Sequence, residues 1–328
     1  MTKSTLLYLL ATVLLITAPI QAQQGRVYRV GVLGPPGRLE EWTDLKGLRD
    51  GLKEAGYAEG KNLLLKIPAV KTYDELRPIA KAYVGEKVDA IVTGGGTATR
   101  IAKEATREIA IIFLWGVGDP VQLGFVKSVA RPETNITGVS SDAGIEIWGK
   151  RLELFKELVP TLRRVVLLYN ARGENPSHDK SLGLLREIAP KLGLKLAEMP
   201  INSPGEVDHA LSPLATDNTN GIFVRCSGLF REPFKRIATI AREKRFPLWG
   251  CFASEGEQGN LATYEPDRYH RGLRGAWYVD RILKGRRPQD LPVEAPMKYE
   301  FVIDLKAARQ IGLTIPPNVL VRADRVIR

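Results

Sequence analysis

Three consecutive glycines, Gly94 to Gly96, follow an apolar run that ends at Thr93. The residues after them have helical spacing, so the sequence predicts a strand, a glycine turn and the start of a helix. Backbone amides and the helix dipole at such a turn attract an anion. The hydroxyl groups of Thr93 and Thr97 flank the turn. We therefore predict that this segment binds a carboxylate or a similar small group.

Aromatic and small polar residues recur at the ends of the other predicted strands. Since the loops after parallel strands gather at one edge of a sheet, these side chains should come together there. Small-molecule sites consist of apolar walls with a few placed polar groups, and this mixture fits that description. A carboxylate ligand is favoured by the cationic Arg225. The candidate ligand-binding residues at strand ends are Trp115, Asp119, Ser140, Tyr169, Asn170, Arg225, Ser227, Phe252 and Tyr264.

Patterns typical of enzymes are scarce. The glycine turn lacks the Lys-Ser/Thr pair of a phosphate loop and the spaced glycines of a dinucleotide site, and no Gly-x-Ser-x-Gly elbow occurs. No two histidines share a helix face, so neither a metal nor a cofactor is expected. The carboxylates of Asp119 and Glu265 could act as acid and base, which leaves an enzyme open as an alternative. Capture of a ligand ammonium group, or helix capping by Asp119, explains them at least as well.

The elements that must position these residues alternate between strand and helix patterns twice along the chain. The first half covers residues 28–140 and includes a helix expected beyond Pro120 that ends at Arg131. The second half repeats the alternation over residues 147–251. Two such halves predict an α/β protein with two doubly wound parallel-sheet lobes. The tail, residues 261–328, supplies further strand and helix and is expected to cross between the lobes, which makes a hinge and a cleft.

Composition and charge fit a globular protein with two cores. The chain has 328 residues, of which 44% are hydrophobic and 26% are charged, and its net charge is +11. Basic residues such as Lys53, Lys150 and Arg151 are spread over the predicted helices. This distribution is typical of solvated helix faces rather than of a nucleic-acid-binding stripe, so no nucleic acid partner is expected.

The first 22 residues have the pattern of an export signal. Lys3 precedes an apolar run from Leu6 to Thr17, and Ala22 ends an acceptable cleavage site. The run is too short for a comfortable membrane span of about 20 residues, although an uncleaved anchor stays open. We predict a signal peptide over residues 1–22, cleavage near Ala22, and a mature protein that works in the periplasm.

Cys226 and Cys251 are the two cysteines of the chain, and each ends an apolar run. If those runs are neighbouring parallel strands, the two sulfur atoms could lie close enough for a disulfide bond. Two free buried thiols are the other outcome, and the sequence does not decide between them.

Several segments in a fixed order resemble one protein family. They are GLKEAGYAEGKN at 51–62, TGGGTA at 93–98, GDPVQLG at 118–124, RPETNITGVS at 131–140, KRLEL at 150–154, LVP at 158–160, ILKG at 282–285 and GLTIPP at 312–317. With them the chain resembles the extracytoplasmic substrate-binding proteins of ABC transporters, in the group related to tryptophan and tyrosine binders. The resemblance covers nearly all of the mature chain.

This resemblance implies a periplasmic-binding-protein type I fold, in which two lobes joined by three crossings close over a small molecule and dock on a membrane permease. Lobe 1 would comprise residues 26–140 with 265–296, and lobe 2 residues 141–264 with 297–328. The resemblance adds Gly34, Pro35 and Gly116 to the expected ligand contacts, together with the glycine turn. It implies a solute receptor that acts as a monomer. A receptor that reports to a membrane sensor is a further alternative.

Overall fold

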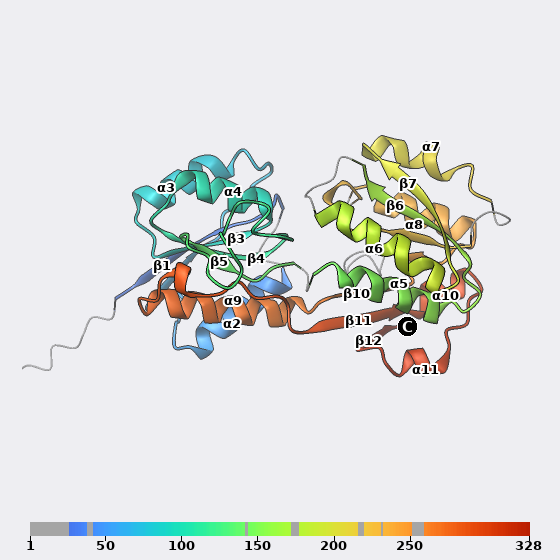
Figure 1. Cartoon of the computed structure of the whole chain (residues 1–328). Helices are drawn as coiled ribbons and strands as arrows, with labels where there is room; N and C mark the ends of the chain where they lie inside the picture. Colours follow the sequence, from blue (N-terminus) through green and yellow to red (C-terminus); the bar gives the residue numbers. More distant parts are fainter. Residues whose placement is uncertain are drawn as a thin grey trace, which may run out of the picture.

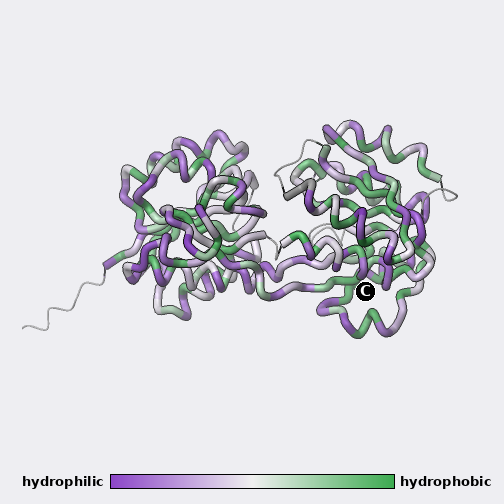
Figure 2. The backbone as a smooth tube through the Cα atoms, viewed as in Figure 1, coloured by the Kyte–Doolittle hydropathy of each residue, from purple (hydrophilic) through white to green (hydrophobic). Residues whose placement is uncertain are grey.

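The computed structural model describes residues 26–37, 42–141, 144–171, 177–215, 220–230, 232–250 and 259–328. It has two α/β lobes that lie side by side, each built around one sheet (Figure 1). Hydrophobic residues concentrate in the strands, and the outer helices carry most of the hydrophilic ones (Figure 2). The predicted signal peptide and Phe252 lie outside the described residues.

The first lobe contains a five-stranded parallel sheet in the order β2-β1-β3-β4-β5. Two helices cover each face, α2 and α9 on one and α3 and α4 on the other (Figure 1). Their bounds are β1 Tyr28–Leu33, α2 Thr43–Glu54, β2 Leu63–Lys66, α3 Leu76–Gly85, β3 Ala90–Gly94, α4 Gly96–Ala105, β4 Ala110–Trp115, β5 Ile136–Gly138 and α9 Arg268–Leu283.

The prediction of a helix beyond Pro120 is wrong. Residues 119–126 form hydrogen-bonded turns, in which the amides of Leu123 and Phe125 donate to the carbonyl groups of Asp119 and Pro120. Gly124 has a φ of +68°, a left-handed conformation that a right-handed helix cannot continue through. The apolar spacing of this segment therefore reflects packing of a folded turn against the sheet.

The second lobe contains a seven-stranded sheet in the order β12-β11-β10-β9-β8-β6-β7. All neighbours are parallel except β10 and β11, which pair antiparallel. The strands are β6 Arg164–Asn170, β7 Lys195–Ile201, β8 Ile222–Val224, β9 Leu248–Trp249, β10 Ala262–Pro266, β11 Tyr299–Asp304 and β12 Arg325–Ile327. The helices are α5 Glu146–Leu158, α6 Ser177–Lys191, α7 Val207–Leu211, α8 Phe234–Glu243, α10 Leu305–Gln310 and α11 Pro317–Leu320, with short 3-10 turns η2 Pro204–Glu206 and η3 Gly228–Phe230. A third 3-10 turn, η5 Pro288–Asp290, belongs to the first lobe, where it lies beside β5.

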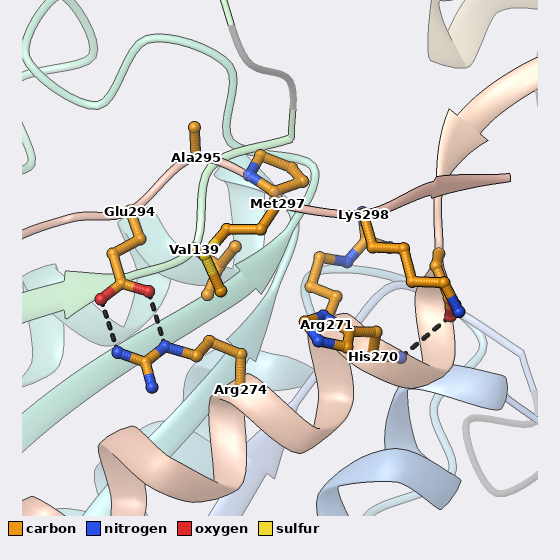
Figure 3. A pocket seen from close by; sticks show the side chains of 10 residues that line it. Val139, His270, Arg271, Arg274, Glu294, Ala295, Met297 and Lys298 are labelled. Carbon is orange, nitrogen blue, oxygen red and sulfur yellow. Dashed lines mark hydrogen bonds and ion pairs between the residues drawn. The ribbon is translucent and has the colours of Figure 1, made fainter.

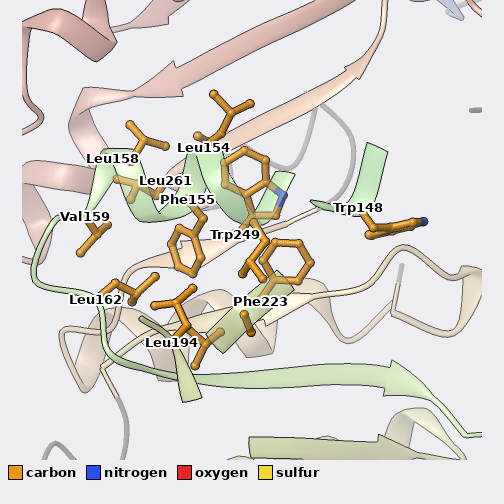
Figure 4. Close-up of a cluster of buried hydrophobic side chains, with 14 of the residues drawn as sticks. Trp148, Leu154, Phe155, Leu158, Val159, Leu162, Leu194, Phe223, Trp249 and Leu261 are labelled. Atoms are coloured by element: carbon orange, nitrogen blue, oxygen red, sulfur yellow. The ribbon is translucent and has the colours of Figure 1, made fainter. Parts of the chain in front are cut away.

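Helix α5 is buried against the sheet of the second lobe through aromatic side chains (Figure 4). Phe223 of β8 and Trp249 of β9 stack with ring centres 6.0 Å apart, and Phe155 of α5 packs on both. Trp148, in the first turn of the same helix, packs edge to face on Phe223 with ring centres 6.5 Å apart. Aromatic contacts of this kind fix α5 in place, and α5 in turn carries residues of the candidate site.

Three segments connect the lobes: one from β5 to α5, one from β10 to α9, and one from η5 to β11. On the side of the first lobe they are tied together, because the amide of Ser140 donates to the carbonyl of Glu294 at 2.8 Å and Arg274 pairs with the Glu294 carboxylate at 2.6 Å. Helix α9 lies close against α2, where buried Asp44 and Arg271 pair at 2.7 Å. The lobe boundaries given above stay a prediction.

Candidate functional site

The carboxyl ends of β6 and β8 bring three of the predicted residues together in the second lobe. Asn170 ends β6, and its side-chain amide donates to the Ser227 hydroxyl at 3.3 Å. Ser227 also accepts from the amide of Leu229 at 3.2 Å. Arg225 follows β8 directly and is 8% exposed. The parallel sheet thus gathers these residues at one edge, as the sequence pattern predicts.

The guanidinium of Arg225 is held from two sides. It donates to the Ser181 hydroxyl of α6 at 2.5 Å, and it lies 5.1 Å from the centre of the Trp148 ring of α5. A guanidinium fixed over an indole face is stabilised by the ring quadrupole and keeps its fork of donors in one plane. Such a group at a strand end is suited to bind a carboxylate.

Arg151 is a residue beside the candidate site that the sequence analysis missed. The expectation that it lies on a solvated helix face is wrong, because it is 1% exposed. Its Nε donates to the carbonyl of Tyr264 at 2.9 Å, and its guanidinium lies 3.1 Å from the Glu265 carboxylate and 4.5 Å from the centre of the Trp148 ring. The signal that could have found it is helical spacing, since Arg151 shares a face with Trp148 and Phe155, three residues before and four after.

Cys226 lies between Arg225 and Ser227 and forms a disulfide bond. The other cysteine of the chain, Cys251, lies outside the described residues. The Cys226 sulfur is 3.7 Å from the Glu265 carboxylate. Because a disulfide sulfur has no proton to donate, this is a packing contact, and it places Glu265 beside the loop that carries Arg225.

In the glycine turn of the first lobe, the amides that can bind a ligand are not the ones that the sequence predicts. The amides of Gly95 and Gly96 donate to the carbonyl groups of Trp115 and Gly116 at 2.6 and 3.0 Å, so both are engaged within the lobe. The next amides, those of Thr97 and Ala98, belong to the first turn of α4 and have no intrahelical partner. Within the described ranges they also meet no other acceptor. Because Ala98 is fully buried and Thr97 is exposed, the amide of Thr97, rather than those of the glycines, is the donor available to an anion.

Trp115 packs mainly into the core of the first lobe and is 7% exposed. Its indole lies across Gly94, where a Cβ would come within 2.0 Å of the ring. Its ring centre is 5.3 Å from that of Trp42, a residue at the start of α2 that the sequence analysis did not single out. Among the described residues the indole Nε1 has no hydrogen-bond partner.

Two predicted polar residues of the first lobe are engaged in local structure. The hydroxyl of Thr93 is fully buried and lies 2.8 Å from that of Thr99. The carboxylate of Asp119 accepts from the amides of Val121 and Gln122, each at 3.0 Å. Asp119 therefore caps a turn, which is the simpler of the roles that the sequence left open.

Tyr169 lies on the helix-covered face of β6, toward Glu198 of β7, rather than beyond the strand end. Burial and the neighbouring Glu198 carboxylate raise the pKa of its hydroxyl. Glu198 in turn accepts two hydrogen bonds from Arg186, each at 2.7 Å, and this hydrogen bonding lowers the pKa of Glu198. Tyr169 is thus part of a surface network on the α6 side of the lobe.

The remaining candidates lie near the crossings or at the edge of the first sheet. The Ser140 hydroxyl donates to the Glu294 carbonyl at 3.3 Å, and the Tyr264 ring stacks on Tyr299 with centres 5.1 Å apart. Gly34, which is buried, and Pro35, which is half-buried, follow β1, and Gly116 is exposed at the end of β4.

A small pocket lies at the hinge, between the start of α9 and residues 294–298 (Figure 3). Its volume is about 10 Å³, room for about one water molecule, so it is too small for a solute. Asp267 caps α9 there and pairs with Lys298 at 2.8 Å. Burial alone would raise the pKa of Asp267, but the His270 amide and Lys298 outweigh it, so this pKa lies below its usual value.

Two further properties concern only the described part of the chain. No group of three or more His, Cys, Asp or Glu side chains there could hold a metal ion. No helix of those ranges is both long enough and apolar enough to cross a membrane.

Comparisons with known proteins identify the family. Residues 36–327 match the model of the "ABC transporter substrate binding protein" family. A tyrosine-binding protein of Clostridioides difficile is 27% identical over 260 residues, which are 79% of this chain and 73% of that protein. A conserved domain protein from Vibrio cholerae has a similar structure, with a TM-score of 0.78, 30% identity, and coverage of 92% of this chain and 100% of its own.

A domain from Streptococcus pneumoniae in complex with L-Trp has a TM-score of 0.79 at 24% identity, over 92% of this chain and 100% of its own. This likeness supports the fold, and together with the matches above it confirms the predicted pair of lobes of the type I periplasmic binding proteins. The chain belongs to the ABC transporter substrate-binding protein family.

Proposed function

We propose that this protein is the extracytoplasmic solute receptor of an ABC importer and that it captures a small carboxylate between its lobes by hinge closure. The observation that carries the proposal is the guanidinium of Arg225, fixed at the end of β8 by Ser181 and Trp148. Charge-assisted hydrogen bonds from such a group to a ligand carboxylate contribute about 1.5 to 3 kcal/mol.

The first lobe supplies the complementary half of the proposed site. The exposed residue Thr97 carries an amide without an intrahelical partner in the first turn of α4, and the half-buried ring of Trp42 lies beside Trp115. In the proposed closed form, this amide and an aromatic ring of one lobe would face the guanidinium of the other, an arrangement that suits an amino acid with an apolar or aromatic side chain. The binding partners named for two relatives, tyrosine and L-Trp, support the same class of ligand.

The cellular setting is part of the proposal. The export pattern that ends near Ala22 supports a mature chain that works in the periplasm, as a monomer that would deliver its solute to permease subunits at the membrane. A role as an enzyme has less support, because Asp119 caps a turn in the first lobe whereas Glu265 pairs with Arg151 in the second. Acid and base would have to act from separate, already engaged positions.

The experiment is calorimetry on the mature chain with L-tyrosine, L-tryptophan and L-phenylalanine, with tyramine as a probe that lacks the carboxylate. We expect an amino acid to bind and tyramine to bind at least tenfold more weakly. Arg225→Met should lower the affinity at least tenfold, a loss of about 1.4 kcal/mol or more. The matched control is Arg236→Met, which removes a half-exposed arginine of α8 that pairs with Asp208 on the surface.

Two results would contradict the proposal. One is an Arg225→Met variant that binds as tightly as the parent chain. The other is recovery of a chemically altered ligand after incubation, detected by chromatography and mass spectrometry, since a receptor returns its ligand unchanged.

A further inference from the structure

Four residues form a continuous stack between the proposed ligand site and a segment that crosses between the lobes. We call them the relay: Arg225, Trp148, Arg151 and Glu265. The Trp148 ring lies within 5.1 Å of the Arg225 guanidinium and 4.5 Å of the Arg151 guanidinium. Arg151 then contacts the carboxylate of Glu265 at 3.1 Å. Two cations therefore share one aromatic ring, and one of them is anchored to β10.

The anchor lies where the chain leaves the second lobe. Arg151 donates to the backbone carbonyl of Tyr264 at 2.9 Å, in addition to its ion pair with the next residue. β10 ends at Pro266, and α9 begins at Arg268 in the first lobe. Any rotation of one lobe against the other must therefore be accommodated within a few residues of the Arg151 contacts.

Burial shows that Arg151 does not itself face a ligand. Its side chain is 1% exposed, whereas that of Glu265 is 12% exposed. Burying this ion pair costs desolvation energy that a hydrophobic pair of the same volume would not cost. A contribution to packing alone is thus a poor explanation for a guanidinium at this position, and a geometric role is a better one.

We propose that Arg151 is a positioning residue, which holds Arg225 in its binding orientation through Trp148 and ties that orientation to the crossing strand β10. This proposal rests on the proposed function, in which Arg225 binds the ligand carboxylate. A ligand shifts the equilibrium between the open and the closed form only to the extent that it binds the closed form more tightly. The relay supplies the physical link by which a contact at Arg225 bears on the geometry of the crossing.

The first test is Arg151→Lys, titrated with L-tyrosine, or with L-tryptophan if that binds the parent chain more tightly. Lysine keeps the charge opposite Glu265, so the fold is retained. A single ammonium group cannot lie flat on Trp148 while donating to both Tyr264 and Glu265. We expect at least a tenfold loss of affinity. The matched control is Lys150→Met, because Lys150 is the adjacent residue of α5 but is 42% exposed and pairs with surface Glu153.

The second test separates positioning from a merely structural role. In an Arg225→Lys background, Arg151→Lys should cause less than about a twofold further loss, because residues that act as one unit are not additive. Small-angle X-ray scattering at saturating ligand should show a smaller decrease in the radius of gyration for Arg151→Lys than for the parent chain.

The outcomes are distinguishable. Three results would overturn the positioning role and leave the proposed function intact. They are losses of affinity that multiply between the two arginine substitutions, full closure of the Arg151→Lys variant, and a lower melting temperature with unchanged affinity. An Arg225→Met variant with normal affinity overturns the proposed function instead. Non-additive losses together with incomplete closure support the positioning role.

Discussion

Gly94 and Gly96 lie two residues apart in the same turn, yet the structure predicts opposite effects when each is changed to alanine. A Cβ at Gly94 would lie 2.0, 2.1 and 2.4 Å from three atoms of the Trp115 indole. At Gly96 the nearest atom is the carbonyl oxygen of Gly116, at 3.7 Å, which is an ordinary van der Waals contact. The pair therefore isolates the effect of the indole from that of removing a glycine.

The magnitudes follow from these contacts. Contacts near 2 Å require the indole to move, and since it is packed between Gly94 and Trp42 it can do so only by opening the core. Overpacking of a filled core costs about 1 to 3 kcal/mol. Gly96 is the first residue of α4 and its φ is not positive, so alanine there gains up to about 1 kcal/mol from reduced backbone entropy in the unfolded chain.

The assay is urea denaturation of both variants beside the parent chain, followed by tryptophan fluorescence. Gly94→Ala should have a lower midpoint and Gly96→Ala an equal or higher one, with unchanged dependence on urea concentration. Displacement of the indole should also change the fluorescence of the folded Gly94→Ala chain. Equal midpoints for the two variants would refute the packing of Trp115 across Gly94.

Three further predictions concern single side chains. Asp119→Ala removes the acceptor for two turn amides, so it should cost about 1 kcal/mol of stability in a thermal melt, with ligand affinity unchanged within about twofold by calorimetry. Tyr169→Phe should leave that affinity unchanged, because the hydroxyl faces Glu198 on the α6 side of the sheet; a loss above about tenfold would instead place it at the ligand. Asp267→Asn should flatten the decline of melting temperature below about pH 4, because a depressed carboxyl pKa stabilises the fold above the unfolded value and loses that contribution as the pH falls. If the melting temperature of Asp267→Asn falls below about pH 4 as steeply as that of the parent chain, the pairing of Asp267 with Lys298 does not contribute to stability.

The sequence predicted the architecture well because the central strands of the sheets are buried on both faces. β3 and β4 are fully buried, so they appear as uninterrupted apolar runs that end at glycines, and such runs are hard to mistake. The helix expected beyond Pro120 failed for a local reason. Its apolar spacing was suitable, but one left-handed glycine, Gly124, turns the chain where a helix would continue.

The site was predicted less completely, because position along a strand does not fix what a polar group contacts. Asn170, Arg225 and Ser227 do lie together at one edge, since parallel strands align their ends. The amides of the glycine turn were expected to be available, but the neighbouring strand accepts from two of them. Hydrogen bonds between the loops after two neighbouring strands depend on the register of those strands, and the spacing of apolar residues does not reveal that register.

The charges of the two lobes suggest where the choice of ligand is made. In the first lobe the Asp119 carboxylate and the Thr93 hydroxyl are engaged locally, which leaves chiefly Thr97 at the start of α4 and aromatic rings for a ligand. Amide N–H groups donate to any anion of suitable shape and discriminate little among ligand side chains. In the second lobe Arg225 is fixed by its neighbours, so it demands a carboxylate at one position and orientation. Substitutions in the loop that carries Arg225 should therefore change which solute is bound, whereas substitutions in the first turn of α4 should weaken binding of every carboxylate alike.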